Sequence, residues 1–351
     1  MRVIKPNIQR LTDYAVEQGL TRVKLNQNES PFDIPDFLKE QILNRMTVTS
    51  WNRYPPGRAT ALIRAISDYT RFPASGIMVG NGSNEIIQTL IYSTCDTGDQ
   101  ILLVKPSFSI YKRIASIMNI DVMEIPLLKD FQFDIPSLIE AGQNAQILML
   151  STPNNPTGTT LQPDQVKEIA ANVPCLVAVD EAYFEFSQKT VQPFLEGADN
   201  MVILRTFSKA LRLANLRIGY LLGQPNLVNH LVKCRLPFSI GSFQQIAGEF
   251  ILKNEDTLIP FIDAIKRERD RIYNELNKMG SIIPIPSEAN FILFKILSIY
   301  GEDLYNSLYH KGVLIRHFDD SLLENWLRVT IGTPEENNLF LDVLGEVVGE
   351  K

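Results

Sequence analysis

The middle of the chain alternates short, almost uninterrupted apolar runs with stretches of helical periodicity. Helical patterns fill the intervals, as at 84–92 and from Ile110 onward. A strand that is apolar on both sides is typical of a parallel sheet covered by helices on both faces. The pattern therefore predicts an α/β domain with a mostly parallel sheet. The apolar, often β-branched runs lie at 77–79, 100–104, 122–125, 146–150, 176–179, 201–204 and 218–222.

After about Leu236 the pattern changes to that of a small α+β domain. A charged helix is predicted through 264–278, and Gly280 follows its end. Strand-like pieces and a final helix come next, at 282–285, 291–294, 313–315, 326–331 and 335–348. We expect three parts: an N-terminal segment that associates with the small domain and a partner subunit, a large domain and a small domain, at 1–30, 31–240 and 241–351.

Composition narrows the class of protein. The 351 residues are 45% hydrophobic and 21% charged, which suffices for a sizeable folded core. The net charge of −6 argues against a nucleic-acid-binding protein. The three cysteines and three histidines lack ligand spacing, so we expect no metal site and no disulfide scaffold. Neither a signal peptide nor an apolar run of about 18 residues is present, which predicts a cytoplasmic protein without membrane contact.

Polar residues that carry chemistry follow three of the apolar runs. Asn155 comes after the first of them, Asp180 and Tyr183 after the second, and Lys209 after the third. Each alone is an ordinary turn, cap or surface residue. In open α/β sheets, however, ligands bind outside the carboxyl ends of the strands. An amine, a carboxylate and hydrogen-bond donors gathered there suit a pyridine-aldehyde cofactor, because the amine forms a Schiff base and the carboxylate faces the ring nitrogen.

A phosphate cradle is also indicated. The segment GNGSNE at 80–85 follows a strand and opens a helix, whose first N–H groups favour an anion. Such a turn alone often serves only the chain topology. Thr206, Ser208 and Arg217 are placed to complete the cradle.

These segments carry a family resemblance. The chain resembles the histidinol-phosphate aminotransferase family, within the fold type I pyridoxal-phosphate enzymes, over nearly its whole length. The resemblance implies a large domain with a seven-stranded, mostly parallel sheet between helices, a smaller α+β domain, and a homodimer. The matching segments are LNQNESPF (25–32), RYPPG (53–57), GNGSNE (80–85), PSFSIY (106–111), PNNPTG (153–158), DEAYFEF (180–186), RTFSKA (205–210), LRIGY (216–220), LPFSIGSFQQ (236–245), SEANFILF (287–294) and LRVTIGTPEEN (327–337).

The resemblance implies roles for the residues that hold pyridoxal 5′-phosphate. Lys209 would form the Schiff base and shuttle the proton, and Asp180 would pair with the pyridinium nitrogen. Asn155 and Tyr183 would bind the cofactor 3-hydroxyl, and Phe108 would stack on the ring. The cofactor phosphate would be held by Ser83, Asn84, Thr206, Ser208, Arg217 and, from the partner subunit, Tyr54.

Substrate residues follow from the same resemblance. Arg328 would meet the substrate phosphate and the carboxylate of the amino acceptor in turn, and Arg316 would contact the phosphate. Tyr14 would cover that phosphate. The family often has glycine where this chain has Arg212 and Asn215. Asn tolerates the left-handed backbone that glycine supplies, whereas arginine has no such advantage.

The function predicted is transamination between L-histidinol phosphate and 2-oxoglutarate, with L-glutamate as donor in the biosynthetic direction of histidine synthesis. An aromatic or broad-specificity aminotransferase and a threonine-phosphate decarboxylase on the same fold stay open as alternatives. A non-catalytic regulator generally carries an added DNA-binding module, for which this chain has no spare length. A nicotinamide dehydrogenase is disfavoured, because GNGSNE does not fit GxGxxG.

Overall fold

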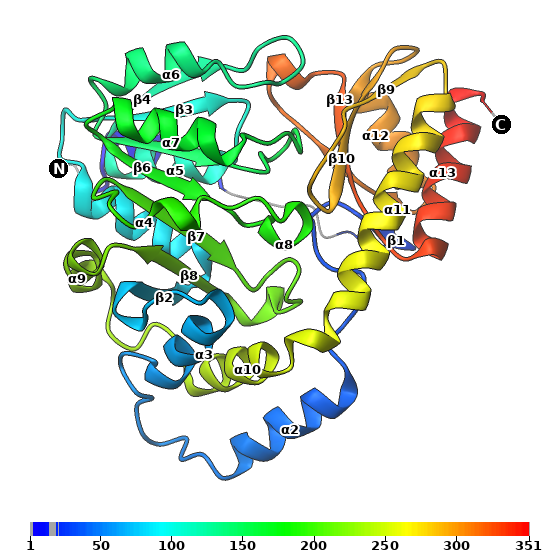
Figure 1. Cartoon of the computed structure of the whole chain (residues 1–351). Coiled ribbons are helices and arrows are strands. Elements are labelled where there is room, and N and C mark those ends of the chain that lie inside the picture. Colours follow the sequence, from blue (N-terminus) through cyan, green and yellow to red (C-terminus); the bar gives the residue numbers. More distant parts are fainter. Residues whose placement is uncertain (1–2, 14–18, 20, 351) are drawn as a thin grey trace.

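The computed structural model describes residues 3–13, 19 and 21–350, and Tyr14 lies outside the described residues. Figure 1 shows a large α/β part beside a smaller part that contains the C-terminal elements. The sequence predicts this division into a mostly parallel sheet and a smaller α+β part, and the structure confirms it. No helix among the described residues is long and apolar enough to cross a membrane.

The large part is built on a seven-stranded sheet. Its order is β2-β8-β7-β6-β5-β3-β4; β8 pairs antiparallel with β2 and with β7, and the other neighbouring pairs are parallel. The strand bounds lie within one or two residues of the apolar runs, because the central strands are buried on both faces. The strands are β2 (Ile77–Asn81), β3 (Gln100–Lys105), β4 (Asp121–Pro126), β5 (Ile147–Ser151), β6 (Leu176–Asp180), β7 (Met201–Thr206) and β8 (Ile218–Gly223).

Helices cover both faces of this sheet (Figure 1). Successive side chains of a strand point to opposite faces, and β3 shows this: Leu102 lies in one core and Leu103 in the other. One core is shared with α4 (Gly82–Thr94), α5 (Ser109–Met118) and α9 (Pro225–Cys234). The other core, called the large core below, is shared with α2 (Asp36–Thr47), α3 (Thr60–Thr70), α6 (Ile135–Gly142), α7 (Pro163–Asn172) and α10 (Ser242–Lys253).

The smaller part has its own sheet and core, called the small core below. The antiparallel order is β12-β13-β10-β9, and a separate parallel pair joins β1 to β11. The strands are β1 (Val23–Lys24), β9 (Ile282–Pro284), β10 (Phe291–Ile296), β11 (Val313–Leu314), β12 (Arg316–His317) and β13 (Trp326–Thr330). The helices packed on them are α11 (Ile259–Lys278), α12 (Gly301–His310) and α13 (Pro334–Val348).

Two details bear on the predicted domain bounds, which stay a prediction. The N-terminal segment joins the smaller part through β1, which pairs with β11. Helix α10 lies after residue 240, yet Ala247 and Ile251 belong to the large core. Short helices complete the fold: α1 (Pro6–Gln9), α8 (Phe184–Ser187) and the 3-10 turns Ala74–Gly76, Gln192–Phe194, Ala214–Leu216, Glu255–Thr257 and Ser321–Leu323.

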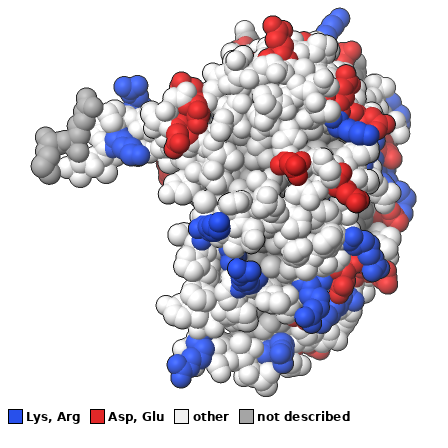
Figure 2. Space-filling view, turned by 60° about the vertical axis from the view of Figure 1, so that its left-hand side comes forward, with Lys and Arg blue, Asp and Glu red and all other residues white. Residues whose placement is uncertain are grey.

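The surface carries both signs of charge. On the described part of the face drawn in Figure 2, Asp and Glu lie mostly along the top and the right-hand side, and Lys and Arg form separate groups that extend to the lower left, among larger areas of other residues. This face has no continuous basic surface of the kind that nucleic acids require among its described residues.

Candidate active site

The predicted site residues converge on one cavity between the two parts. The cavity has a volume of ≈ 550 Å³ and opens at the carboxyl ends of β5, β6 and β7. This is the place where open α/β sheets bind ligands. Its lining includes Ser83, Asn84, Phe108, Asn155, Asp180, Tyr183, Thr206, Ser208, Lys209, Arg217, Arg316 and Arg328.

Lys209 supplies the amine. It follows β7, and its Nζ donates a hydrogen bond of 2.9 Å to the carbonyl of Gln27. Burial lowers the pKa of Lys209 to about 7, and the positive charge of Arg328 acts in the same direction. A substantial fraction of this amine is therefore neutral near pH 7, as a nucleophile and proton carrier requires.

Asp180 supplies the buried carboxylate at the end of β6. Its Oδ2 accepts a 2.6 Å hydrogen bond from the hydroxyl of Tyr111, and its Oδ1 accepts one of 3.1 Å from the N–H of Ala182. Burial raises the pKa of Asp180 to about 6, and both hydrogen bonds oppose that shift. A cationic ring nitrogen placed here would favour the ionised carboxylate.

Asn155 and Tyr183 each keep a donor for the cavity. Asn28 donates its Nδ2 to the hydroxyl oxygen of Tyr183 at 2.9 Å, so the hydroxyl proton remains for another acceptor. Arg328 donates Nη1 to the amide oxygen of Asn155, which leaves the amide nitrogen as a donor. Two such donors suit the oxygen of a pyridinol ring.

The phosphate cradle depends on two close approaches that require glycine. A Cβ on Gly219 would lie 2.4 Å from the backbone nitrogen of Ser83, at the first turn of α4. Gly82 has a φ of +74°, and its Cβ would lie 2.6 Å from Nη2 of Arg217. The guanidinium also donates to Ser208 Oγ at 3.1 Å. A helix N-terminus, a hydroxyl and a guanidinium therefore meet where a phosphate would bind.

Phe108 stands at the start of α5 and faces the cavity. Its ring meets that of Tyr111 edge to face, with centroids 5.5 Å apart, and this contact fixes the orientation of both rings. The cavity thus offers an amine, a carboxylate, a phosphate cradle and a ring surface, which are the groups that pyridoxal 5′-phosphate needs.

The two arginines expected to bind the substrate are direct cross-strand neighbours. Arg316 on β12 is paired in register with Arg328 on β13. Arg328 is buried, and its Nη2 donates to the carbonyl of Asn26 at 2.8 Å. Like charges directly opposite each other are unfavourable in a sheet unless an anion lies between them. The pair therefore concentrates positive charge at the edge of the cavity.

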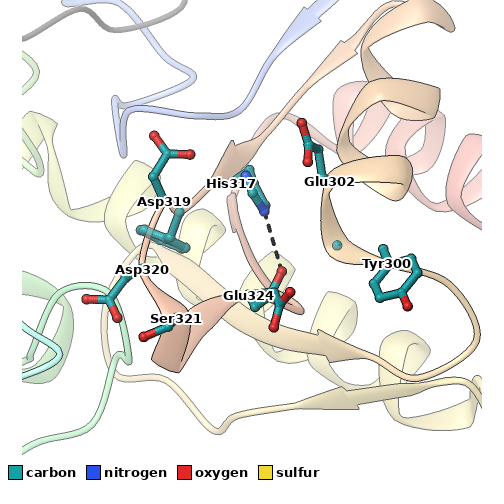
Figure 3. Close-up of a pocket in the computed structure, with 9 residues that line it drawn as sticks. Tyr300, Glu302, His317, Asp319, Asp320, Ser321 and Glu324 are labelled. Atoms are coloured by element: carbon teal, nitrogen blue, oxygen red, sulfur yellow. Dashed lines mark hydrogen bonds between the residues drawn. The ribbon is translucent and has the colours of Figure 1, made fainter.

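A second hollow lies beside the first, and Figure 3 shows its lining. It measures ≈ 340 Å³ and shares Phe318, Asp319 and Asp320 with the active-site cavity. Glu302 and Glu324 add two more carboxylates, so this hollow disfavours an anionic ligand. No group of His, Cys, Asp and Glu among the described residues is arranged to hold a metal ion.

Tyr54 does not line the cavity of its own chain. Its side chain is 82% exposed and stacks on the ring of Phe238 at 4.6 Å. Its expected action from a partner subunit stays a prediction.

Sequence reasoning missed the residues that orient the site residues. Tyr111 binds Asp180, Asn28 binds Tyr183, and the carbonyls of Asn26 and Gln27 hold Arg328 and Lys209. All lie within PSFSIY and LNQNESPF, two of the segments that carry the family resemblance, and this was the available signal.

Comparisons with known proteins agree with this geometry. Residues 21–344 match the model of the family described as aminotransferase class I and II. A histidinol-phosphate aminotransferase of Chlorobium phaeovibrioides is 37% identical over 357 residues, which cover 99% of this chain and 98% of that protein.

Two solved structures have the same fold. Histidinol-phosphate aminotransferase from Sinorhizobium meliloti, in complex with pyridoxal-5′-phosphate, gives a TM-score of 0.91 at 23% identity and covers 99% of this chain and 98% of that one. L-threonine-O-3-phosphate decarboxylase from Porphyromonas gingivalis gives a TM-score of 0.82 at 21% identity. That match covers 93% of this chain and 100% of the decarboxylase chain. At such identities the likeness establishes the fold alone.

Proposed function

The chain belongs to the class I and II aminotransferases, and we propose that it moves an amino group between L-histidinol phosphate and 2-oxoglutarate. In the biosynthetic direction, L-glutamate donates the amino group to 3-(imidazol-4-yl)-2-oxopropyl phosphate, a step of histidine biosynthesis. The full-length similarity to a histidinol-phosphate aminotransferase supports this assignment.

Pyridoxal 5′-phosphate supplies the aldehyde and the electron-withdrawing ring that make the substrate C–H acidic. The chain's own residues do the rest. Lys209 Nζ takes the proton from the substrate carbon and returns it, which its lowered pKa of about 7 permits. Asp180 would hold a positive charge at the ring nitrogen, and Asn155 and Tyr183 would donate to the ring oxygen.

The observation that carries the substrate assignment is the cross-strand pair of Arg316 and Arg328. A phosphate monoester near neutral pH carries close to two negative charges, which two guanidiniums can neutralise. The carboxylates of 2-oxoglutarate can use the same pair in the second half of the reaction. A single carboxylate, as in an aromatic amino acid, needs only one of the two arginines.

Two alternatives share this site. An aromatic or broad-specificity aminotransferase would accept phenylalanine as well as histidinol phosphate. A threonine-phosphate decarboxylase would release carbon dioxide and would not need 2-oxoglutarate. Product analysis with each substrate separates the three activities.

A homodimer is part of the proposal. Apolar side chains are exposed in the segment of Tyr54 and beside it, namely Trp51 and Phe238, whose ring stacks on that of Tyr54. Exposed apolar surface of this kind is typical of a protein interface. In a dimer, Tyr54 would reach the cofactor phosphate of the neighbouring site. A cytoplasmic location is also proposed, because Cys95, Cys175 and Cys234 are free thiols, as expected in a reducing compartment.

The test compares Arg316→Ala and Arg328→Ala by their kcat/KM for three substrates. We expect Arg316→Ala to lower kcat/KM for histidinol phosphate by about 30-fold or more, because truncating one partner of a charge pair that the bound substrate buries typically costs about 2–5 kcal/mol. The kcat/KM of Arg316→Ala for phenylalanine should fall much less. Arg328→Ala should damage both substrates and 2-oxoglutarate as well.

Arg267→Ala is the matched control, since Arg267 is exposed on α11 away from the cavity. It should leave all three values near those of the unaltered enzyme. An equal loss for all three substrates in Arg316→Ala would make Arg316 structural and remove the support for a phosphorylated substrate.

A further inference from the structure

The turn that carries Lys209 ends in an arginine with an unusual backbone. Arg212 has a φ of +60°, a conformation that L side chains rarely adopt, and its N–H donates to the carbonyl of Lys209 at 3.2 Å. The two residues between Lys209 and Arg212 pack in different cores. Ala210 belongs to the small core and Leu211 to the large core. The turn therefore stands at the boundary between the two parts.

The side chain of Arg212 is only 8% exposed and makes two specific contacts. Its Nη1 donates a 2.6 Å hydrogen bond to the carbonyl of Asp33. Its guanidinium carbon lies 3.7 Å from the ring centroid of Phe261, and that ring packs against Phe32. Nη2 is buried without a hydrogen-bond partner among the described residues.

Both contacts fall where the chain crosses from one part to the other. In the first crossing, Phe32 packs against the small core and Ile34 belongs to the large core, with Asp33 between them. In the second crossing, Leu258 belongs to the large core and Ile265 to the small core. Phe261 lies between these two, near the start of α11, which runs from one part along the other (Figure 1).

We propose that Arg212 is a positioning residue that couples the placement of the two parts to the turn carrying Lys209. The Arg212 guanidinium contacts both segments that connect the two parts. It donates a hydrogen bond to the carbonyl of Asp33 in one and stacks on the ring of Phe261 in the other. Its own backbone is bonded to Lys209. A movement of the smaller part, which carries Arg316 and Arg328, is therefore transmitted to the amine that must reach the same substrate.

The proposal deepens the proposed function and rests on it only for the role of Lys209. It gives the Arg212 side chain a role at a position with a positive φ. Glycine would adopt this positive φ at a lower energetic cost than arginine. The guanidinium contacts offer the physical reason for an arginine at this position.

The experiment measures amide hydrogen exchange by mass spectrometry in the full-length holoenzyme. The variants are Arg212→Gly, Arg212→Leu and Arg212→Lys. Arg71→Gly is the matched control, because Arg71 is an exposed arginine with a φ of +57° at the end of α3. Three segments are followed: 206–213, 31–35 and 258–263.

We expect Arg212→Gly to speed exchange by about 10-fold in all three segments, since local opening is controlled by such contacts. Arg71→Gly should leave all three unchanged. Arg212→Leu keeps part of the packing but cannot donate to Asp33, so it should resemble Arg212→Gly. Arg212→Lys keeps the positive charge and a donor for the carbonyl of Asp33, and it lacks the unpaired Nη2. It should therefore restore most of the protection from exchange.

Activity gives the second measurement. Loss of the coupling should change kcat and KM together, by about 10-fold in kcat/KM for the amino donor and the acceptor alike. Exchange rates and kcat/KM of Arg212→Leu equal to those of the unaltered enzyme would show that Arg212 only fills space. Faster exchange confined to 206–213 would equally overturn the proposal. The exchange measurement needs no substrate, so a failure of the histidinol-phosphate assignment would leave its result intact.

Discussion

Burial shifts the pKa values of Lys209 and Asp180 in opposite directions. Burial lowers the pKa of Lys209 to about 7 and raises that of Asp180 to about 6. Both groups therefore change charge close to physiological pH, as catalytic groups often do. Nearby groups then refine each value: Arg328 lowers the pKa of Lys209 further, and Tyr111 stabilises the Asp180 carboxylate.

The lowered pKa of Lys209 predicts its chemical reactivity. In cofactor-free protein, modification of Lys209 by trinitrobenzenesulfonate should rise with pH around a midpoint near 7, because only the neutral amine reacts. Between this pKa and the ordinary lysine pKa of 10.5, the unfolded chain binds the proton and the folded chain does not. Raising the pH through that window therefore increases the contribution of Lys209 to folding stability.

Peptide mass spectrometry after modification at each pH gives the midpoint. The control is the same chain unfolded in urea, in which Lys209 should titrate near the ordinary lysine value of about 10.4. The same high midpoint in the folded protein would mean that the amine is not desolvated.

Sequence reasoning found the strand-end residues because chain topology alone brings them together. Asn155, Asp180 and Lys209 follow parallel neighbours in the sheet, and their carboxyl ends share one edge. Tyr111 and Asn28 reach the same cavity from a helix and from the N-terminal segment. No local pattern encodes such long-range contacts, so the sequence analysis did not single out these two residues.

At the scale of elements, a buried ion pair joins the ends of β6 and β7. Arg205 donates to Oε2 of Glu181 at 2.8 Å, and both side chains are almost fully buried. Glu181 also accepts from the N–H of Val191 and from the hydroxyl of Thr190. These residues directly flank Asp180 and Thr206, so the pair fixes the two strand ends that present them.

Breaking this pair should destabilise the protein strongly. We expect Glu181→Ala to lower the free energy of unfolding by about 3–5 kcal/mol, because Arg205 is then left buried and unpaired. Glu275→Ala is the control, since its pair with Lys278 is exposed. That change should stay within about 0.5 kcal/mol. Urea unfolding measures both, and equal effects of the two substitutions would contradict the structural role of the Glu181–Arg205 pair.

The element boundaries were predictable to different degrees. Strands buried on both faces are almost continuous apolar runs, so β3, β5 and β7 were found within one or two residues. The antiparallel direction of β8 was not predicted, because its residues are as apolar as those of its parallel neighbours. Strand β12 was also missed, since two residues give no period.

At the scale of the whole molecule, the account requires two chains for one complete site. A mixture of Tyr54→Phe and Lys209→Ala chains should show more activity than the sum of the two variants assayed separately. In a hybrid dimer, one site carries both changes and the other carries neither. A one-to-one mixture should reach about a quarter of the normal activity, because half of the dimers are hybrids with one intact site.

Subunit exchange must be shown independently, for example by native mass spectrometry. The Lys209→Ala homodimer, in which both sites lack the amine, serves as the inactive control. Proven exchange without recovered activity would place Tyr54 outside the neighbouring site.

The central claim is that a transaminase of this fold selects a phosphorylated amino alcohol through two neighbouring arginines. The most direct measurement is kcat/KM of the unaltered holoenzyme for histidinol phosphate, histidinol and phenylalanine, with 2-oxoglutarate as acceptor and glutamate as the detected product. The account predicts a preference for histidinol phosphate over histidinol of about 30-fold or more, since a lost charge-assisted contact of about 2–5 kcal/mol corresponds to at least that ratio. Equal kcat/KM for histidinol phosphate and histidinol, or faster turnover of phenylalanine, would contradict it.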